Sequence, residues 1–260
     1  MAIALVGQAG QAGNSAGSPL AITYSSTAHN TLILTGHLYD SNAGAFVAPT
    51  SVTDSTGGTN AWHISTSATQ AALTVQTPPL CSITDPSDGG AAHFANFVAW
   101  CIGAAAVTSV TLAWEGGLST WRRVALSEWS GIAQFDQSWA GGSTTGTESV
   151  TSGPFFLRVA GELILGDLDY GDGGTSSLPA SWTGLTSGGG GNAYRLLTAV
   201  TGSYSPAWTN TASAGWAGAI AVFSPSVLYS GAQPEPASAR LPGHQAQSQQ
   251  VYQPGLINVN

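Results

Sequence analysis

Residues Glu162–Tyr170 read ELILGDLDY, and the fold of the chain can be reasoned outward from this stretch. Side chains alternate between the two faces of a β-strand. One face would carry Leu163, Leu165, Asp167 and Asp169, and the other Ile164, Gly166, Leu168 and Tyr170. The pattern predicts a buried strand with a polar exit.

An earlier stretch, Thr31–Asp40, reads TLILTGHLYD and places similar residues in a matching order, namely Leu32, Ile33, Leu34, Leu38 and Tyr39. In both places a Gly/Ser-rich loop, a tryptophan, further strands and a late strand that begins with tryptophan follow. We therefore expect two related sheet-forming halves, at about residues 20–132 and 150–225, that pack face to face.

The fold class follows from short apolar runs separated by turn residues. No stretch longer than about ten residues combines helical periodicity with capping residues. The 34 glycines and 13 prolines would interrupt helices often. The pattern predicts an all-β, antiparallel sandwich of the jelly-roll kind over residues 1–225. Residues 7–18 and the Gly/Ser-rich surroundings of Trp139 are interpreted as loops.

Charge excludes several classes of partner. Only 7% of the residues are charged, against about 25% in ordinary globular proteins, and the net charge is −8. All five basic residues are arginines. We expect no nucleic-acid partner, because phosphate binding needs a basic patch. We expect no membrane partner either: anionic lipids would repel the chain, and no apolar run approaches the ~20 residues of a span. No export signal is recognised at the N-terminus.

Several acidic residues are candidate metal ligands or catalytic acids. Asp167, Asp169 and Asp172 resemble the start of a calcium loop, but the EF-hand spacing and its final glutamate are missing, which favours a solvated strand end. Residues Glu115, Glu128 and Glu162 offer no clear pair of the glycosidase kind. For Glu128, a carboxylate satisfied by arginine or backbone donors is favoured.

Other motifs are weaker. Residues 13–17, GNSAG, match the G-x-S-x-G nucleophile elbow, but no strand before it or helix after it is expected, so we predict a loop. The histidines (His29, His37, His63, His93 and His244) show no zinc-site spacing. Cys81 and Cys101 are too few for a disulfide framework, and Cys101 is expected to be buried. We assign no catalytic residue, cofactor or metal.

Nine tryptophans are either core residues or sugar-stacking platforms. Trp100, Trp129 and Trp216 lie in strand patterns and are expected in the core. Trp139 is the best candidate for an exposed ring. Exposed, coplanar rings would indicate carbohydrate binding.

The C-terminal residues 226–260 differ in kind from the rest. Residues 233–250 read QPEPASARLPGHQAQSQQ and hold almost no large apolar side chain, which is typical of an extended arm. Apolar residues return at the end, with Val251, Tyr252, Leu256 and Ile257. We expect these four to bind a neighbouring subunit by strand addition, the alternative being that the arm folds back on its own domain.

Four stretches carry a resemblance: SVTDSTGGTNAWHIS (51–65), VALSEWSGI (124–132), AGELILGDLDY (160–170) and TGSYSPAWTNTASAGWAGAIAVF (201–223). They resemble a β-sandwich module of phage head decoration proteins and minor tail proteins. The shared pattern is T-D-S-x-G-N-x-W, then E-x-S-G, then A-G-E-L. This chain departs from it by an extra glycine before Asn60 and by the Asp-rich exit after Glu162.

The resemblance implies a non-enzymatic virion protein, assembled in the host cytoplasm. It implies a capsid decoration or cement protein that binds major capsid or tail subunits and copies of itself through its sandwich edges and its C-terminal arm. The alternative is a minor tail protein or adhesin whose sandwich binds a host glycan. The resemblance supplies no catalytic residues.

Overall fold

The computed structural model describes residues 1–13, 18–40, 47–66, 69, 74, 76–84, 93–115, 121–170, 176–185, 191–199 and 202–225. The chain divides into two units, Met1–Leu228 and Tyr229–Asn260. The second unit lies outside the described residues, and so do the predicted arm, its four apolar residues and Asp172.

Every element in the described part of the chain is a β-strand, which confirms the all-β prediction. The strands are β1 (Ala4–Gly13), β2 (Leu20–Thr23), β3 (Thr31–Asp40), β4 (Ala48–Asp54), β5 (Leu80–Thr84), β6 (His93–Cys101), β7 (Ser109–Glu115), β8 (Trp121–Ser130), β9 (Gln134–Thr151), β10 (Phe155–Phe156), β11 (Glu162–Tyr170), β12 (Ser176–Ser177), β13 (Thr183–Gly184), β14 (Ala193–Leu197), β15 (Ser203–Tyr204) and β16 (Ala207–Ser224).

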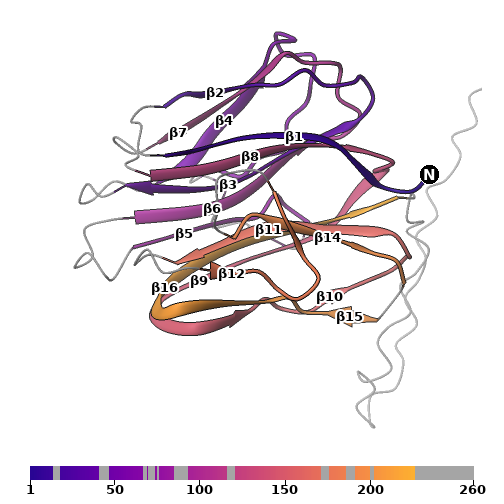
Figure 1. The fold of residues 1–260 in the computed structure, drawn as a ribbon. Coiled ribbons are helices and arrows are strands. Elements are labelled where there is room, and N and C mark those ends of the chain that lie inside the picture. The colour runs from indigo at the N-terminus through magenta and orange to yellow at the C-terminus, as the bar shows by residue number, and fades with distance from the viewer. Residues whose placement is uncertain are drawn as a thin grey trace, which may run out of the picture. The chain divides into compact units, whose positions relative to one another are not determined.

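These strands form antiparallel sheets that pack against one another (Figure 1). The first central sheet has the order β1-β8-β3-β6-β5, and an outer sheet of β2-β7-β4 covers one of its faces. The second central sheet contains β16, β11, β14 and β13, with β9 and β12 also paired to β16. A small β10-β15 pair completes the set. The antiparallel sandwich is confirmed, and its jelly-roll character stays a prediction.

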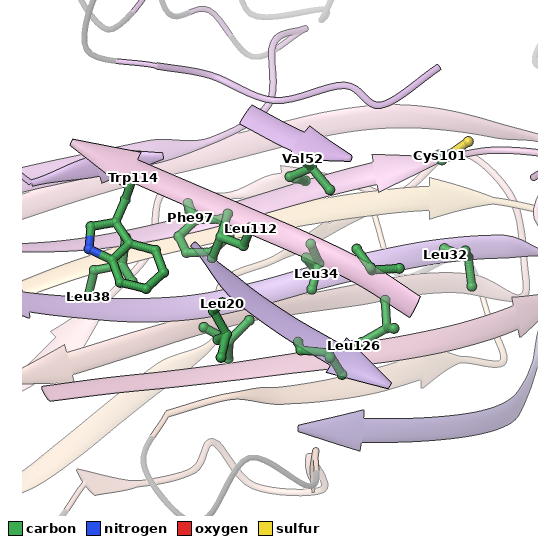
Figure 2. Packing of buried hydrophobic residues seen from close by; sticks show 14 of the residues in the cluster. Leu20, Leu32, Leu34, Leu38, Val52, Phe97, Cys101, Leu112, Trp114 and Leu126 are labelled. Carbon is green, nitrogen blue, oxygen red and sulfur yellow. The ribbon is translucent and has the colours of Figure 1, made fainter. Parts of the chain in front are cut away.

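Three apolar layers hold the sheets together. The first core lies between the outer sheet and the first central sheet and contains Leu34, Phe97 and Leu112 (Figure 2). The second, which we call the seam, lies between the two central sheets and contains Trp129 and Phe223. The third core covers the other face of the second central sheet. Both central sheets are therefore buried on both faces, which explains the nearly unbroken apolar runs of their inner strands β3, β6 and β11.

The two central sheets share one strand order. Reading β1-β8-β3-β6-β5 beside β9-β16-β11-β14-β13 pairs each strand with its counterpart later in the chain. This observation adds support to the interpretation of two related halves. In both sheets the strand at the centre, β3 or β11, is the stretch on which that interpretation rests.

The sheet faces that the side chains occupy show that β3 and β11 correspond one residue away from the alignment of their identical letters. Aligning the letters places Leu32 on Leu163, yet Leu32 lies in the first core and Leu163 in the seam. Aligning Gly36 with Gly166 instead preserves the faces. A Cβ on Gly36 would lie 2.9 Å from a ring carbon of Phe97, and one on Gly166 would lie 2.3 Å from the backbone oxygen of Ala219. Close packing requires glycine at both places.

Two loop predictions were wrong. Residues 7–13 continue strand β1, and Gln134–Thr151 form the long strand β9. Both are rich in Gly, Ala, Ser or Thr and look like loops by composition. They are strands because each has a long antiparallel partner: β8 for β1, and β16 for β9. Because β1 runs up to Gly13, the expectation that no strand precedes the GNSAG motif was also wrong. The other four residues of that motif lie outside the described part of the chain.

Candidate functional site

A cluster of polar side chains lies in the seam at the exit of β11. His37, Asn96 and Arg123 come from the first central sheet, and Asp167 and Asp169 from the second. The Asn96 side-chain amide donates to Asp167 Oδ2 at 2.9 Å, and Arg123 Nη1 to Asp169 Oδ2 at 2.8 Å. His37 Nδ1 lies 3.3 Å from Asn96 Oδ1 and 3.9 Å from Asp169 Oδ2. We call these five residues the seam cluster.

The two aspartates of the seam cluster differ in their surroundings. Burial, and then the charge of Asp169, raise the pKa of Asp167 well above its usual range, against the opposing effects of Arg123 and Asn96. Asp169 pairs with Arg123 and also accepts the backbone N–H of Tyr170 at 2.9 Å. Burial thus favours the protonated form of Asp167, whereas the Asp169 carboxyl group faces the guanidinium of Arg123. The cluster links the halves by one ion pair and a hydrogen-bond chain.

The prediction of a solvated strand end was wrong. Asp167 and Asp169 are 1% and 4% exposed, because the first central sheet covers the face on which they lie. Their carboxylates meet Asn96 and Arg123. Among the residues that the structure describes, no group of three His, Cys, Asp or Glu side chains is arranged to hold a metal ion. Asp172 lies outside those residues.

Glu128 is a second buried carboxylate, and its side chain anchors a turn. Its Oε2 accepts the Tyr24 hydroxyl at 2.7 Å, and its Oε1 accepts the Thr27 backbone N–H at 2.9 Å and the Asn30 amide at 2.6 Å. The predicted backbone donor is found at Thr27. The other two donors are the side chains of Tyr24 and Asn30, and none of the three is an arginine. Burial, followed by Glu128, raises the pKa of Tyr24. Glu128 holds the segment before β3 on the first central sheet.

The T-D-S…N-x-W pattern forms a clasp around one carboxylate. Asp54 Oδ1 accepts the Thr56 N–H and hydroxyl, and Oδ2 accepts the Asn60 amide at 3.0 Å and the Trp62 indole N–H at 2.8 Å. Burial works in the opposite direction, but these hydrogen bonds lower the pKa of Asp54. The extra glycine is accommodated in the turn, where Gly57 and Gly58 have φ of 70° and 103°. These motif residues close a turn.

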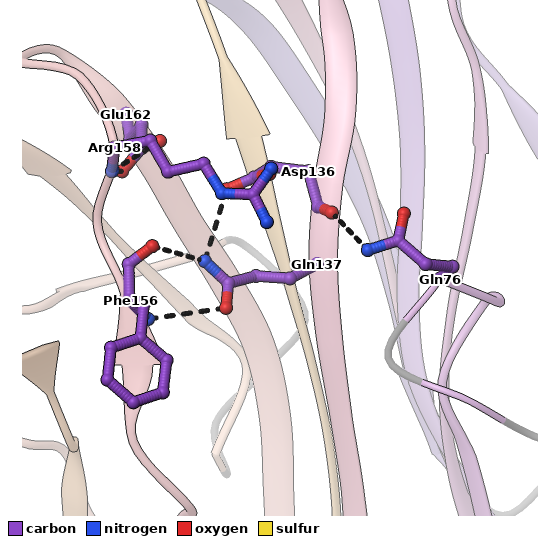
Figure 3. A network of polar contacts seen from close by, with 6 residues as sticks. All are labelled: Gln76, Asp136, Gln137, Phe156, Arg158 and Glu162. Carbon is purple, nitrogen blue, oxygen red and sulfur yellow. Dashed lines mark hydrogen bonds and ion pairs between the residues drawn. The ribbon is translucent and has the colours of Figure 1, made fainter. Parts of the chain in front are cut away.

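A third carboxylate cluster lies where β9, β10 and β11 meet (Figure 3). Both Glu162 oxygens accept the Arg158 backbone N–H at 3.3 Å, and Arg158 Nη1 lies 3.2 Å from Asp136 Oδ1. The Gln137 side chain donates to the Phe156 carbonyl at 2.9 Å and accepts its N–H at 3.3 Å. Glu162, the glutamate of the A-G-E-L motif, therefore stabilises the segment just before β11.

Both acids of this cluster hold protons more tightly than usual. Burial raises the pKa of Glu162 from 4.5 to about 7, with the nearby charge of Asp136 adding to the rise and bonds from Arg158 and Val159 opposing it. Burial also raises the pKa of Asp136, although Arg158 opposes this. A buried acid with a pKa near neutrality makes stability depend on pH.

Replacement of Glu162 by glutamine is expected to flatten that dependence. Because the folded state binds the Glu162 proton more tightly, the free energy of unfolding should fall as pH rises from 4.5 through about 7. Urea unfolding at several pH values should find Glu162→Gln similar to the native chain at pH ~5 and more stable by about 2–3 kcal/mol at pH ~8. Parallel curves for the two proteins would contradict this.

The tryptophans divide between core and partly exposed positions. Trp100 and Trp129 are buried, as predicted. Trp216 is half-buried, and so is Trp139, which packs on the third core rather than standing in a loop. The Trp139 and Trp216 rings are parallel within 10°, with centroids 6.1 Å apart. The benzo edge of Trp139 lies so close to Gly141 that a Cβ there would be 2.6 Å away.

The remaining predicted residues take structural positions. Cys81 and Cys101 are free and buried, as expected for Cys101, and burial raises both thiol pKa values, that of Cys81 to about 11. The candidate carboxylates Glu128 and Glu162 have separate hydrogen-bond partners and do not meet. Asp136, which no motif singled out, is the acid that lies near Glu162.

Comparison with known proteins adds no relative: no family model, no curated protein and no solved structure matches this chain. Among the described residues, no helix has the length and apolar character needed to cross a membrane.

Proposed function

We propose that this chain is a non-enzymatic structural protein of a bacteriophage particle, a capsid decoration protein that cements neighbouring subunits. It would bind them through sheet edges and through the C-terminal arm at residues 226–260. The observation that carries the proposal is that the residues of the motifs that resemble those of phage proteins make structural hydrogen bonds within this chain. In the T-D-S motif Asp54 closes a turn, and in A-G-E-L Glu162 braces a strand start.

The use of the buried carboxylates supports the same proposal. Glu128 accepts three hydrogen bonds from its own chain, and Asp169 is paired with Arg123. Groups held in this way stabilise a fixed body, whereas a general acid or base needs a substrate within reach. A rigid sandwich with few charges suits repeated contacts that vary little with salt. In a symmetric shell each contact recurs many times, so modest affinity per site suffices.

The test is whether the chain is a component of particles. Particles of the virus that encodes it would be purified and their proteins quantified by mass spectrometry. We expect the chain in a fixed, multiple-copy ratio to the major capsid protein. Particles that lack it, made by cells in which it is expressed, would contradict the proposal.

A second candidate is a minor tail protein or adhesin that binds a host glycan. The observation in its favour is the parallel, half-buried pair of Trp139 and Trp216. Aromatic rings of this kind can stack on a sugar ring. A glycan array would give hits that Trp139→Ala removes if this candidate holds, and an array without hits would eliminate it.

A further inference from the structure

We infer that Trp182, Arg195 and Tyr204 form a binding site for the carboxylate group of an acidic sugar. The inference rests on the glycan-binding candidate above, because it names the class of sugar that this candidate would recognise. The three side chains come from the turn before β13, from β14 and from β15. We call these three residues the donor cluster, because each side chain carries a hydrogen-bond donor.

The Tyr204 hydroxyl group joins the donor cluster. Its oxygen accepts the Trp182 indole N–H at 2.7 Å and an N–H from Arg195 Nη1 at 3.0 Å. The guanidinium carbon of Arg195 also lies 5.0 Å from the centroid of the Tyr204 ring, within the range of a cation–π contact. Trp182 is buried, and its ring meets that of Trp208 edge to face with centroids 5.1 Å apart. These contacts hold the cluster in place before a ligand arrives, which lowers the ordering cost of binding.

The donor cluster has more donors than acceptors. Indole and guanidinium groups only donate, and a tyrosine oxygen that accepts from both still has its own proton to donate. Among the described residues, no group accepts that proton, and the one hydrogen bond of the Arg195 side chain is the bond to Tyr204. Arg195 and Tyr204 are half-buried, so solvent reaches them. The cluster therefore offers donors to a ligand that supplies acceptors.

Arg195 differs from two other arginines in having no acidic partner. Arg123 and Arg158 pair with aspartates, but no Asp or Glu pairs with Arg195 in the part of the chain that the structure describes. The segments that flank β14 in sequence, 186–190 and 200–201, contain no Asp or Glu either. A guanidinium group matches a planar carboxylate through two parallel hydrogen bonds. Arg195 is thus suited to a carboxylate that a ligand brings.

Charge and aromatic surface narrow the class of ligand. The net charge of −8 would repel a polyanion over a distance, whereas a single carboxylate meets a smaller repulsion. An acidic sugar combines one carboxylate with hydroxyl oxygens that can accept from Tyr204. The half-buried rings of Trp139 and Trp216 pack on the same core as Tyr204 and provide further aromatic surface for sugar rings. These features favour an acidic sugar over an acidic peptide segment.

The turn that positions Trp182 has a backbone conformation that is uncommon for its residue type. Ser181 has φ of 67°, in the left-handed region that residues other than glycine rarely adopt. The Trp182 N–H donates to the Pro179 carbonyl at 3.1 Å and closes this turn. Such conformations persist where surrounding contacts hold them, and they cluster at ligand sites. Here the turn places the indole N–H against the Tyr204 hydroxyl.

The test is a glycan array probed with the full chain, on which sialylated and uronic-acid glycans are matched with neutral counterparts. We expect hits that carry a carboxylate. Calorimetry should find that amidation of the carboxylate in the best hit weakens binding by at least about tenfold, the loss typical of a hydrogen bond to a charged group. Arg195→Gln should weaken binding of the acidic form by a similar factor and leave binding of the amidated form unchanged.

Tyr204→Phe keeps the ring beside Arg195 and removes the hydroxyl group. It should weaken binding of the acidic glycan by about threefold or more, and it tests the site if Arg195→Gln does not fold. Thr53→Asp, at an exposed position of the outer sheet, changes the net charge as Arg195→Gln does. Ser203→Ala alters the exposed neighbour of Tyr204. Both controls should bind like the native chain, and circular dichroism should show that every variant is folded.

An array without carboxylate-bearing hits would overturn the inference, and so would acidic hits that Arg195→Gln and Tyr204→Phe leave unchanged. Equal affinity for N-acetylglutamate and for the best acidic glycan would show that the sugar is not recognised and would also overturn it. Neutral hits that Trp139→Ala removes and Arg195→Gln leaves would discard this site and keep the glycan-binding candidate. Particle composition tests the decoration proposal separately.

Discussion

Replacement of Arg123 by methionine is expected to lower the free energy of unfolding by about 3 kcal/mol, because it leaves the buried charge of Asp169 without its partner. The Asp169 side chain is 6% exposed and the Arg123 side chain 22%, so solvent offers the carboxylate little compensation. Burial, and then the charge of Asp169, already raise the pKa of the adjacent Asp167 well above its usual range. Urea unfolding at pH ~7 measures the effect.

The matched control is the double variant Arg123→Met with Asp169→Asn. It removes both charges, so it should recover much of the stability that the single variant loses. A loss below about 1 kcal/mol for Arg123→Met would place this pair among ordinary surface ion pairs and would contradict the account of the seam cluster.

Replacement of Trp129 by alanine is expected to cost about 3–5 kcal/mol, the range typical for removal of a large buried aromatic side chain. Trp129 is fully buried in the seam. Its indole N–H donates to Ser127 Oγ at 2.8 Å, and its ring meets that of Tyr194 edge to face with centroids 4.9 Å apart. The residue joins β8 of one half to β14 of the other.

Trp139→Ala serves as the comparison, because Trp139 is half-buried on the third core and lies outside the seam. It should cost clearly less than Trp129→Ala. Thermal and urea unfolding, followed by tryptophan fluorescence and circular dichroism, should agree for both variants. Equal losses would mean that the seam contributes no more than an outer layer.

Sequence alone predicted the central strands well and the edge strands poorly. In Glu162–Tyr170 the apolar run Leu163–Leu165 and the alternation that follows it predict a strand, whose boundaries agree with β11. β1 and β9 carry mostly small or polar residues. Their strand state depends on pairing with β8 and β16, which is a tertiary effect that a local pattern does not contain. To recognise β1 and β9 as strands from sequence, one would need a related sequence in which the alternation is visible at the same positions.

The polar sites show the same division. The hydrogen-bonding role of Glu128 followed from its strand face, since Glu128 shares that face with the buried residues Val124 and Leu126. The burial of Asp167 and Asp169 did not, because the sheet that covers them comes from the other half of the chain. Polar residues at the end of a strand look solvated until the opposite layer is known. Asp136, near Glu162, had no motif to mark it.

The measurement that tests the central claim most directly is the occupancy of a shortened chain on particles. A chain without residues 233–260 keeps every described strand and should unfold with the same free energy as the full chain. If the protein cements a particle through its arm, this shortened chain should be almost absent from purified particles. Normal occupancy of the shortened chain would contradict the claim.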